Sequence, residues 1–195
     1  MKALTATILV VLLGLTAAAP AAAGGIEQGT VELVTNTGFS YSSYSEDGDG
    51  VSVTNLRLGG SVGYFFTSLS ELQVALLVDH TSIDIDGGGS ASVTNTGMAV
   101  HYIANFATES AIVPFIGAGA GVLAHGGDVG NADAASFIMP RILGGIRFLV
   151  GNSASVNLAL SYEHQTNALG VEDVSGNVIM LDVGVSAFVQ GGRSE

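Results

Sequence analysis

Hydrophobic and polar residues alternate with a period of two through most of the chain after residue 27. Alternate residues of a strand share one face, so this period predicts β-strands with an apolar face and a polar face. Turn-like stretches divide the alternation into separate runs. Eight such runs can be counted, at residues 28–44, 51–66, 71–84, 95–106, 111–125, 136–149, 154–166 and 177–190.

The connections between these runs alternate in length. Short turns are expected at residues 67–70, 107–110 and 150–153, and longer Gly- and Asp-rich loops at 45–50, 85–94, 126–135 and 167–176. An even strand number with short turns on one side and longer loops on the other is typical of outer-membrane barrels. We therefore predict an all-β fold, an eight-stranded antiparallel transmembrane up-and-down β-barrel. Both termini would be periplasmic and the long loops extracellular.

The charged residues sort onto one face of the predicted strands. In the second run Leu56, Leu58 and Val62 share a face, opposite Asn55 and Arg57. An arginine facing lipid at the bilayer centre would cost about 2–4 kcal/mol, so arginines within strands belong inside the barrel, paired with carboxylates. The charges predicted to form an ion-paired network in the lumen are Glu32, Arg57, Asp79, Arg141, Arg147, Glu163 and Asp182.

The predicted strand number limits what the lumen can hold. An eight-stranded barrel is just wide enough for its own side chains, so a wide aqueous pore is not expected. Because many positions on the polar face are Gly, Ala or Ser, a narrow water-filled passage remains an alternative.

Aromatic residues occur mostly near the ends of the predicted strands. Such placement resembles the interfacial girdles of membrane barrels, although aromatic residues also favour strands in general. The residues expected in girdles are Tyr41, Tyr44, Tyr64, Phe65, Phe66, Phe106, Phe115, Phe148, Tyr162 and Phe188.

The first 23 residues have the features of a secretory signal. Lys2 precedes an apolar run from Ala3 to Leu15, and small residues end at Ala23. The apolar run is shorter than the roughly 20 residues that a spanning helix needs, which favours a cleaved signal over an anchor. We expect a signal peptide at 1–23, cleaved after Ala23, and one outer-membrane barrel domain at 24–195.

Composition supports a membrane location without helices. Mean hydropathy is +0.52 and only 11% of residues are charged. Because backbone polar groups need partners in lipid, an apolar chain without spanning helices must close a sheet. The formal net charge of −12 excludes nucleic acid as a partner held by phosphate neutralisation. The absence of cysteine excludes a disulfide framework.

Three segments resemble the OmpA-like outer-membrane β-barrel domain family. They are Gly59–Phe66, Val113–Gly121 and Gly144–Phe148, and their order and spacing cover essentially the whole chain after the signal. The resemblance implies a small, monomeric barrel whose partners are outer-membrane lipid, lipopolysaccharide and the barrel-assembly machinery. Members of the family stabilise the envelope, adhere, interact at the surface or give minor permeability, and no single residue carries the choice among these roles.

The sharpest hint of catalysis is a histidine followed by a serine and a carboxylate, His80, Ser82 and Asp84. On a strand they share the predicted lipid face, where they could form an acyl hydrolase acting on lipid A. Residues two apart on a strand lie about 6.5–7 Å apart, too far for a proton relay unless the side chains lean together. Polar residues where the strand leaves the bilayer explain them more simply.

No cofactor or metal site is expected. The segment Gly119–Ala124 mimics a dinucleotide-binding motif, but no helix follows it. The acidic loops lack EF-hand spacing, and the histidines lack the spacing of a zinc site. We therefore expect a non-enzymatic structural or surface-interaction barrel, the alternatives being a lipid A acyl hydrolase and a narrow, low-conductance channel.

Overall fold

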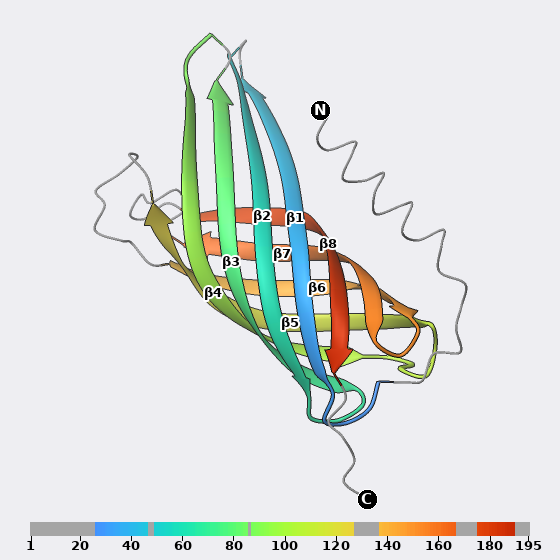
Figure 1. Ribbon diagram of the computed structural model, residues 1–195. Helices are drawn as coiled ribbons and strands as arrows, with labels where there is room; N and C mark the ends of the chain where they lie inside the picture. Colours follow the sequence, from blue (N-terminus) through green and yellow to red (C-terminus); the bar gives the residue numbers. More distant parts are fainter. Residues whose placement is uncertain (1–25, 47–48, 86, 127–136, 167–174, 190–195) are drawn as a thin grey trace, which may run out of the picture.

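The computed structural model describes residues 26–46, 49–85, 87–126, 137–166 and 175–189. Eight strands form one closed barrel in chain order, each antiparallel to the next, and β8 pairs with β1 to close it (Figure 1). The predicted fold class is therefore confirmed. The strands are β1 (Val31–Glu46), β2 (Asp49–Phe65), β3 (Ser70–Ile85), β4 (Ser90–Asn105), β5 (Ile112–Gly126), β6 (Phe137–Val150), β7 (Ala154–Thr166) and β8 (Ser175–Val189).

One end of the barrel, called here the short-turn end, carries the connections at residues 66–69, 106–111 and 151–153. These match the predicted short turns closely. The first strand starts at Val31, later than predicted, because Gly29 adopts a φ of +86° and turns the chain just before the strand. Both described ends of the chain lie at this end of the barrel, since Val189 pairs with Val31 and the Ile26 N–H donates to Thr108 O in the turn between β4 and β5.

At the opposite end, called the hairpin end, two connections are shorter than predicted. β1 reaches Glu46 and β2 begins at Asp49, while β3 reaches Ile85 and β4 begins at Ser90. The predicted loops at 45–50 and 85–94 were therefore too long. Serine, threonine and valine favour strands, and in β4 Val93 faces inward while Thr94 faces outward, so pairing continues beyond the apolar stretch. The other two predicted loops lie largely outside the described residues.

The outer surface of the barrel is apolar. Along β3 the burial alternates, with Ala75 and Leu77 buried and Leu76 at 64% exposure. A contiguous apolar exterior on a closed sheet is the lipid-facing band of a membrane barrel. Within the described residues, no helix is long and apolar enough to cross a membrane. Exposed members of this band include Leu33, Leu58, Val62, Leu72, Val74, Val78, Met98, Val100, Ile116, Ile142, Leu160, Ile179, Leu181 and Val185.

Three of the predicted girdle aromatics lie inside the barrel. Phe65, Phe115 and Phe188 are 0%, 7% and 9% exposed, so assigning them to a girdle was wrong. They share strand parity with inward residues, as Phe188 does with Asp182, and the parity of a strand overrides the preference of a residue type. The exposed aromatics of the described strands and turns include Tyr41, Tyr64, Phe66, Tyr102, Phe106 and Tyr162.

Candidate functional site

The lumen holds the buried charges of the described chain. Three arginines and five carboxylates are each at most 7% exposed, and they form three groups, one around each arginine. The seven residues that the sequence assigned to the lumen are among them. The eighth, Glu71, was missed. These buried charges are Glu32, Arg57, Glu71, Asp79, Arg141, Arg147, Glu163 and Asp182.

The Arg57 group joins opposite walls of the barrel. Arg57 and Asp79 are cross-strand neighbours on β2 and β3, and the guanidinium binds this carboxylate through Nε at 3.0 Å and through Nη2. The same guanidinium donates two further hydrogen bonds to Glu163 of β7, at 2.7 and 2.8 Å. Asn55 donates to Asp79 at 2.5 Å and Gln165 donates to Glu163 at 2.7 Å. Both carboxylates of this group, Asp79 and Glu163, therefore have more than one donor residue, as burial of charge requires.

The Arg141 group connects three consecutive strands, β6, β7 and β8. Arg141 Nη2 lies 2.6 Å from Asp182 Oδ2 and 2.8 Å from Ser161 Oγ. Ser161 donates to the same carboxylate oxygen at 2.6 Å, so a closed triangle of hydrogen bonds forms. Gly38 of β1 makes room for this carboxylate, because a Cβ added at Gly38 would lie 2.7 Å from Asp182 Oδ1.

The Arg147 group lies nearest the short-turn end. Arg147 Nη2 is 3.0 Å from Glu32 Oε2 and 3.2 Å from Glu71 Oε2. The rings of Phe65, Phe115 and Phe188 surround the guanidinium carbon, with centroids 5.6, 5.5 and 5.8 Å away. Strand parity could have found Glu71, because it stands eight residues before Asp79 on the same face of β3.

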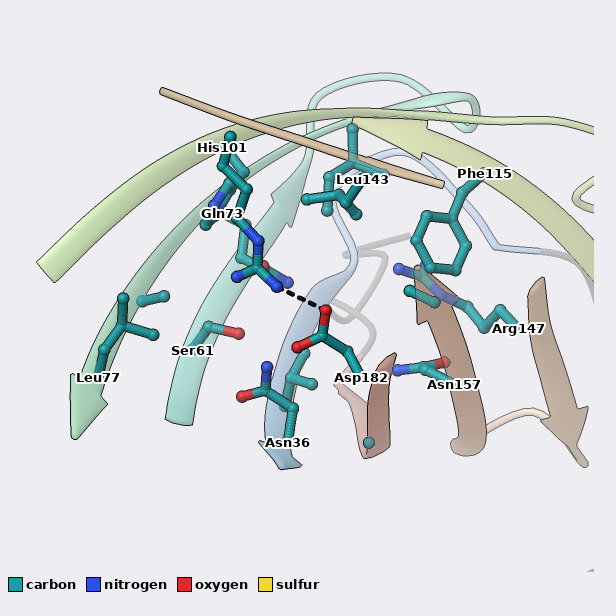
Figure 2. A pocket seen from close by; sticks show the side chains of 16 residues that line it. Asn36, Ser61, Gln73, Leu77, His101, Phe115, Leu143, Arg147, Asn157 and Asp182 are labelled. Atoms are coloured by element: carbon teal, nitrogen blue, oxygen red, sulfur yellow. Dashed lines mark hydrogen bonds and ion pairs between the residues drawn. The ribbon is translucent and has the colours of Figure 1, made fainter. Parts of the chain in front are cut away.

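A cavity of about 70 Å³ lies between the Arg141 and Arg147 groups. Figure 2 shows it from close by, with the ion pair of Arg141 and Asp182 drawn beside Asn36 and His101. Both ring nitrogens of His101 are buried without a protein partner, as is Asp182 Oδ1. A water molecule needs about 10–15 Å³ of such volume and two to four polar partners, so this cavity can be hydrated.

The candidate catalytic residues lie on the outer wall, away from the lumen. Ser82 Oγ is 3.4 Å from His80 Nε2, so these side chains do lean toward each other, a possibility that strand spacing left open. His80 Nδ1 lies 2.9 Å from Thr94 Oγ1, its cross-strand neighbour on β4. In the part of the chain that the structure describes, Asp84 makes no hydrogen bond to this pair. The third member of the cluster is therefore a hydroxyl and not a carboxylate.

Comparison with known proteins identifies the protein family. Residues 7–186 match a protein family described as the outer membrane protein beta-barrel domain. No curated protein sequence matches the chain.

Among solved structures, the outer membrane protein OprG of Pseudomonas aeruginosa is similar with a TM-score of 0.60 at 16% identity, over 86% of this chain and 99% of OprG. Neisserial surface protein A gives 0.56 at 19% identity, over 82% of this chain and 99% of that chain. The N-terminal barrel domain of Pseudomonas aeruginosa OprF gives 0.51 at 17% identity, over 83% and 98%. At these identities the likeness concerns the fold.

Proposed function

Because the chain belongs to the outer membrane protein β-barrel domain family, we propose that it has a structural or surface-interaction role there and no catalytic role. The observation that supports this most is the filled lumen, in which Arg57 ties β2 and β3 to β7 through buried charges. Side chains that link opposite walls stiffen a barrel and leave no wide path through it. Such a barrel acts as a rigid scaffold for the loops and turns at its two ends.

We place the short-turn end and both termini in the periplasm and the hairpin end outside the cell. The connections after β5 and β7, at residues 127–136 and 167–174, are longer than any connection at the short-turn end, and this difference supports the orientation. The partners that follow are outer-membrane lipid around the apolar band, lipopolysaccharide at the hairpin end and the barrel-assembly machinery during insertion. We propose a monomer, because the three charge groups are completed within one chain.

The test uses cells that lack the gene. If the barrel stabilises the envelope, the deletion strain will be sensitive to detergent, and the wild-type gene will restore resistance. A version with the β1–β2 and β3–β4 hairpins shortened at their tips separates the two roles: it restores resistance if the role is structural and fails if the hairpins bind a partner. Protease added to intact cells checks the orientation, because cleavage is expected only at the hairpin end.

The His80 cluster favours a second candidate, hydrolysis of an acyl ester of an outer-leaflet lipid. Ser82 would be the nucleophile and His80 its base, since the Oγ–Nε2 distance of 3.4 Å is close to hydrogen-bond range. Thr94 would hold the other ring nitrogen. A neutral hydroxyl stabilises an imidazolium less than a carboxylate does, which ranks this candidate below the first.

The discriminating variant is Ser82→Ala. Lipid A is extracted from cells with the wild-type protein, the variant or neither, and its acyl chains are compared by mass spectrometry. An acyl chain lost only with the wild-type protein would establish the enzyme and refute the non-catalytic proposal. Identical lipid A in all three, together with rescue of detergent resistance by Ser82→Ala, would eliminate the hydrolase.

A further inference from the structure

The two strands that close the barrel separate before they reach the hairpin end. β1 pairs with β8 from Val31 to Phe39, where Phe39 lies opposite Leu181. β1 nevertheless continues to Glu46 and stays paired with β2 along its whole length. In the described chain, residues 175–180 of β8 pair with β7 alone. Figure 1 shows this divergence, with β1 to β4 extending together past the region where β1 meets β8. One edge of the extended sheet is therefore left without a strand partner among the described residues.

Side-chain contacts hold the first part of β8 against β7. Tyr162 Oη donates to Asn177 Oδ1 at 2.8 Å, and His164 Nδ1 lies 2.8 Å from the same oxygen. Asn177 is also the cross-strand neighbour of His164, so backbone pairing and side chains act together. β8 would have to break these contacts in order to follow β1. The separation of β1 from β8 is therefore a stable feature of the wall.

The pairing pattern identifies the backbone groups that are free at this edge. Alternate residues of an antiparallel strand direct their N–H and C=O groups to opposite sides of the strand. The Phe65 N–H donates to Thr30 O, directly before β1, so residues with the parity of Thr30 face β2. The register with β2 continues to Glu46 without a bulge, which keeps this parity along the strand. Residues of the other parity face β8 and, beyond Phe39, the free edge. Those with free backbone groups are Tyr41, Ser43 and Ser45.

The free edge lacks the features that normally protect one. Proteins block exposed edges with lysine, proline, bulges or very short strands. Residues 40–45 read Ser-Tyr-Ser-Ser-Tyr-Ser and contain neither lysine nor proline. Residues 31–39 already match the ~9–11 residues with which a tilted strand crosses a bilayer, which places the edge beyond the lipid. Another extended chain can therefore reach it from the aqueous side.

The part of the sheet that carries this edge is acidic. Glu46 and Asp49 lie opposite each other at the end of the β1–β2 ladder, and Asp84 is exposed near the end of β3. No lysine or arginine occurs at residues 40–56 or 80–105. A second copy of this chain would bring like charges together at the edge. A partner with basic residues is attracted instead.

We infer that the β1 edge, residues 41–45, is a docking site for an extended, positively charged peptide segment of another protein, which adds a strand to the sheet. This deepens the proposed surface-interaction role and rests on it. Backbone hydrogen bonds to the free groups of the edge supply affinity, because a row of N–H and C=O groups is complementary to another extended backbone. Lysine or arginine in the partner complements the acidic sheet.

The test uses a short synthetic peptide of alternating threonine and valine, with a lysine at each end and a fluorescent label. Its binding to the mature chain refolded in detergent is followed by fluorescence anisotropy. Ser43→Pro removes an N–H that faces the free edge and leaves the pairing with β2 intact, so binding should weaken about tenfold or more. Ser43→Ala is the matched control, because it keeps this N–H and should bind like the wild type. Heat-modifiable migration on gels shows that both variants are folded.

Hydrogen exchange locates the contact, since the amides of Tyr41, Ser43 and Ser45 should be protected when the peptide binds. The same peptide with glutamate in place of lysine should bind more weakly. The inference is overturned if the wild-type chain binds neither peptide, or if folded Ser43→Pro binds as well as Ser43→Ala. A dimer of the chain that excludes the peptide and is lost in Ser43→Pro would also overturn it, because the occupant would then be a second copy.

Failure of the proposed function is recognised separately. Peptide binding in detergent does not depend on the orientation of the barrel in cells. Protease cleavage of intact cells at the short-turn end would therefore refute the proposed surface role while leaving peptide binding unchanged. Cleavage at the hairpin end without peptide binding would remove this inference alone.

Discussion

Arg57 and Glu163 are separated by 106 positions in the sequence and meet through two hydrogen bonds of 2.7 and 2.8 Å across the lumen. The two parallel bonds are the geometry in which a guanidinium and a carboxylate interact most strongly. Because the same guanidinium also binds Asp79, one arginine pairs with two buried carboxylates from different walls. Loss of Arg57 and loss of Glu163 should therefore lower the free energy of unfolding by different amounts.

Removing Arg57 should cost more stability than removing the charge of Glu163. Arg57→Met leaves Asp79 and Glu163 buried without their counter-charge, and losing one partner of a buried pair costs about 3–5 kcal/mol. Glu163→Gln leaves Arg57 paired with Asp79, so we expect a loss of about 1–2 kcal/mol. Urea unfolding from lipid vesicles measures both. Equal losses, or a larger loss for Glu163→Gln, would show that the shared guanidinium does not organise this group.

Two adjacent glycines of β6 provide a matched pair. A Cβ at Gly145 would lie 2.8 Å from Ala159 Cα and 2.8 Å from the Phe115 ring, and it would also meet the carbonyl oxygen of Leu158. A Cβ at Gly144 has Phe115 O, 3.8 Å away, as its one neighbour within 4 Å. We expect Gly145→Ala to destabilise by about 1–3 kcal/mol through overpacking, and Gly144→Ala to be close to neutral. The refolded fraction on gels, with and without heating, gives the comparison.

Strand periodicity was sufficient to predict the barrel and the faces of its strands, because in a membrane barrel parity decides between lipid and lumen. It could not predict which lumenal charges meet. Parity places Arg57 and Glu163 inside the barrel. Whether they meet depends on the tilt and stagger of their strands, which determine the level of each side chain along the barrel axis and the direction in which it points. The sequence contains no local signal for a contact between β2 and β7.

The two errors in the lumen have a common cause. Phe65, Phe115 and Phe188 were assigned to the outside by residue type, and Glu71 was overlooked near the start of its strand. Parity applied to every position of each strand would have placed all four inside. Their proximity to Arg147 would still have been missed, because this cluster brings together residues from β2, β3, β5 and β8 at one level of the barrel.

The aromatic surroundings of Arg147 predict that lysine cannot replace it. The guanidinium carbon of Arg147 lies 5.5–5.8 Å from the ring centroids of Phe65, Phe115 and Phe188 while its Nη2 reaches Glu32 and Glu71, whereas an ammonium is a compact, strongly hydrated charge. We expect Arg147→Lys to lose about 2 kcal/mol of unfolding free energy, comparable with one desolvated cation–π contact. Lys at this position with wild-type stability in urea would mean that charge alone is required.

Ala107 offers a route to a more stable barrel. It adopts a φ of +54° in the turn between β4 and β5, a left-handed conformation that costs an L-residue about 1–2 kcal/mol. Glycine adopts this φ freely but loses more chain entropy on folding, so Ala107→Gly should gain about 0.5–1 kcal/mol. The control is Ala111→Gly in the same exposed turn, where φ is not positive.

At that position glycine brings only the entropic cost, so Ala111→Gly should lower the free energy of unfolding by a similar amount. The two substitutions remove the same methyl group from the same turn. Opposite signs in urea unfolding would therefore assign the effect to backbone conformation. Two changes of the same sign would assign it to the lost side chain and leave the left-handed conformation of Ala107 without measurable cost.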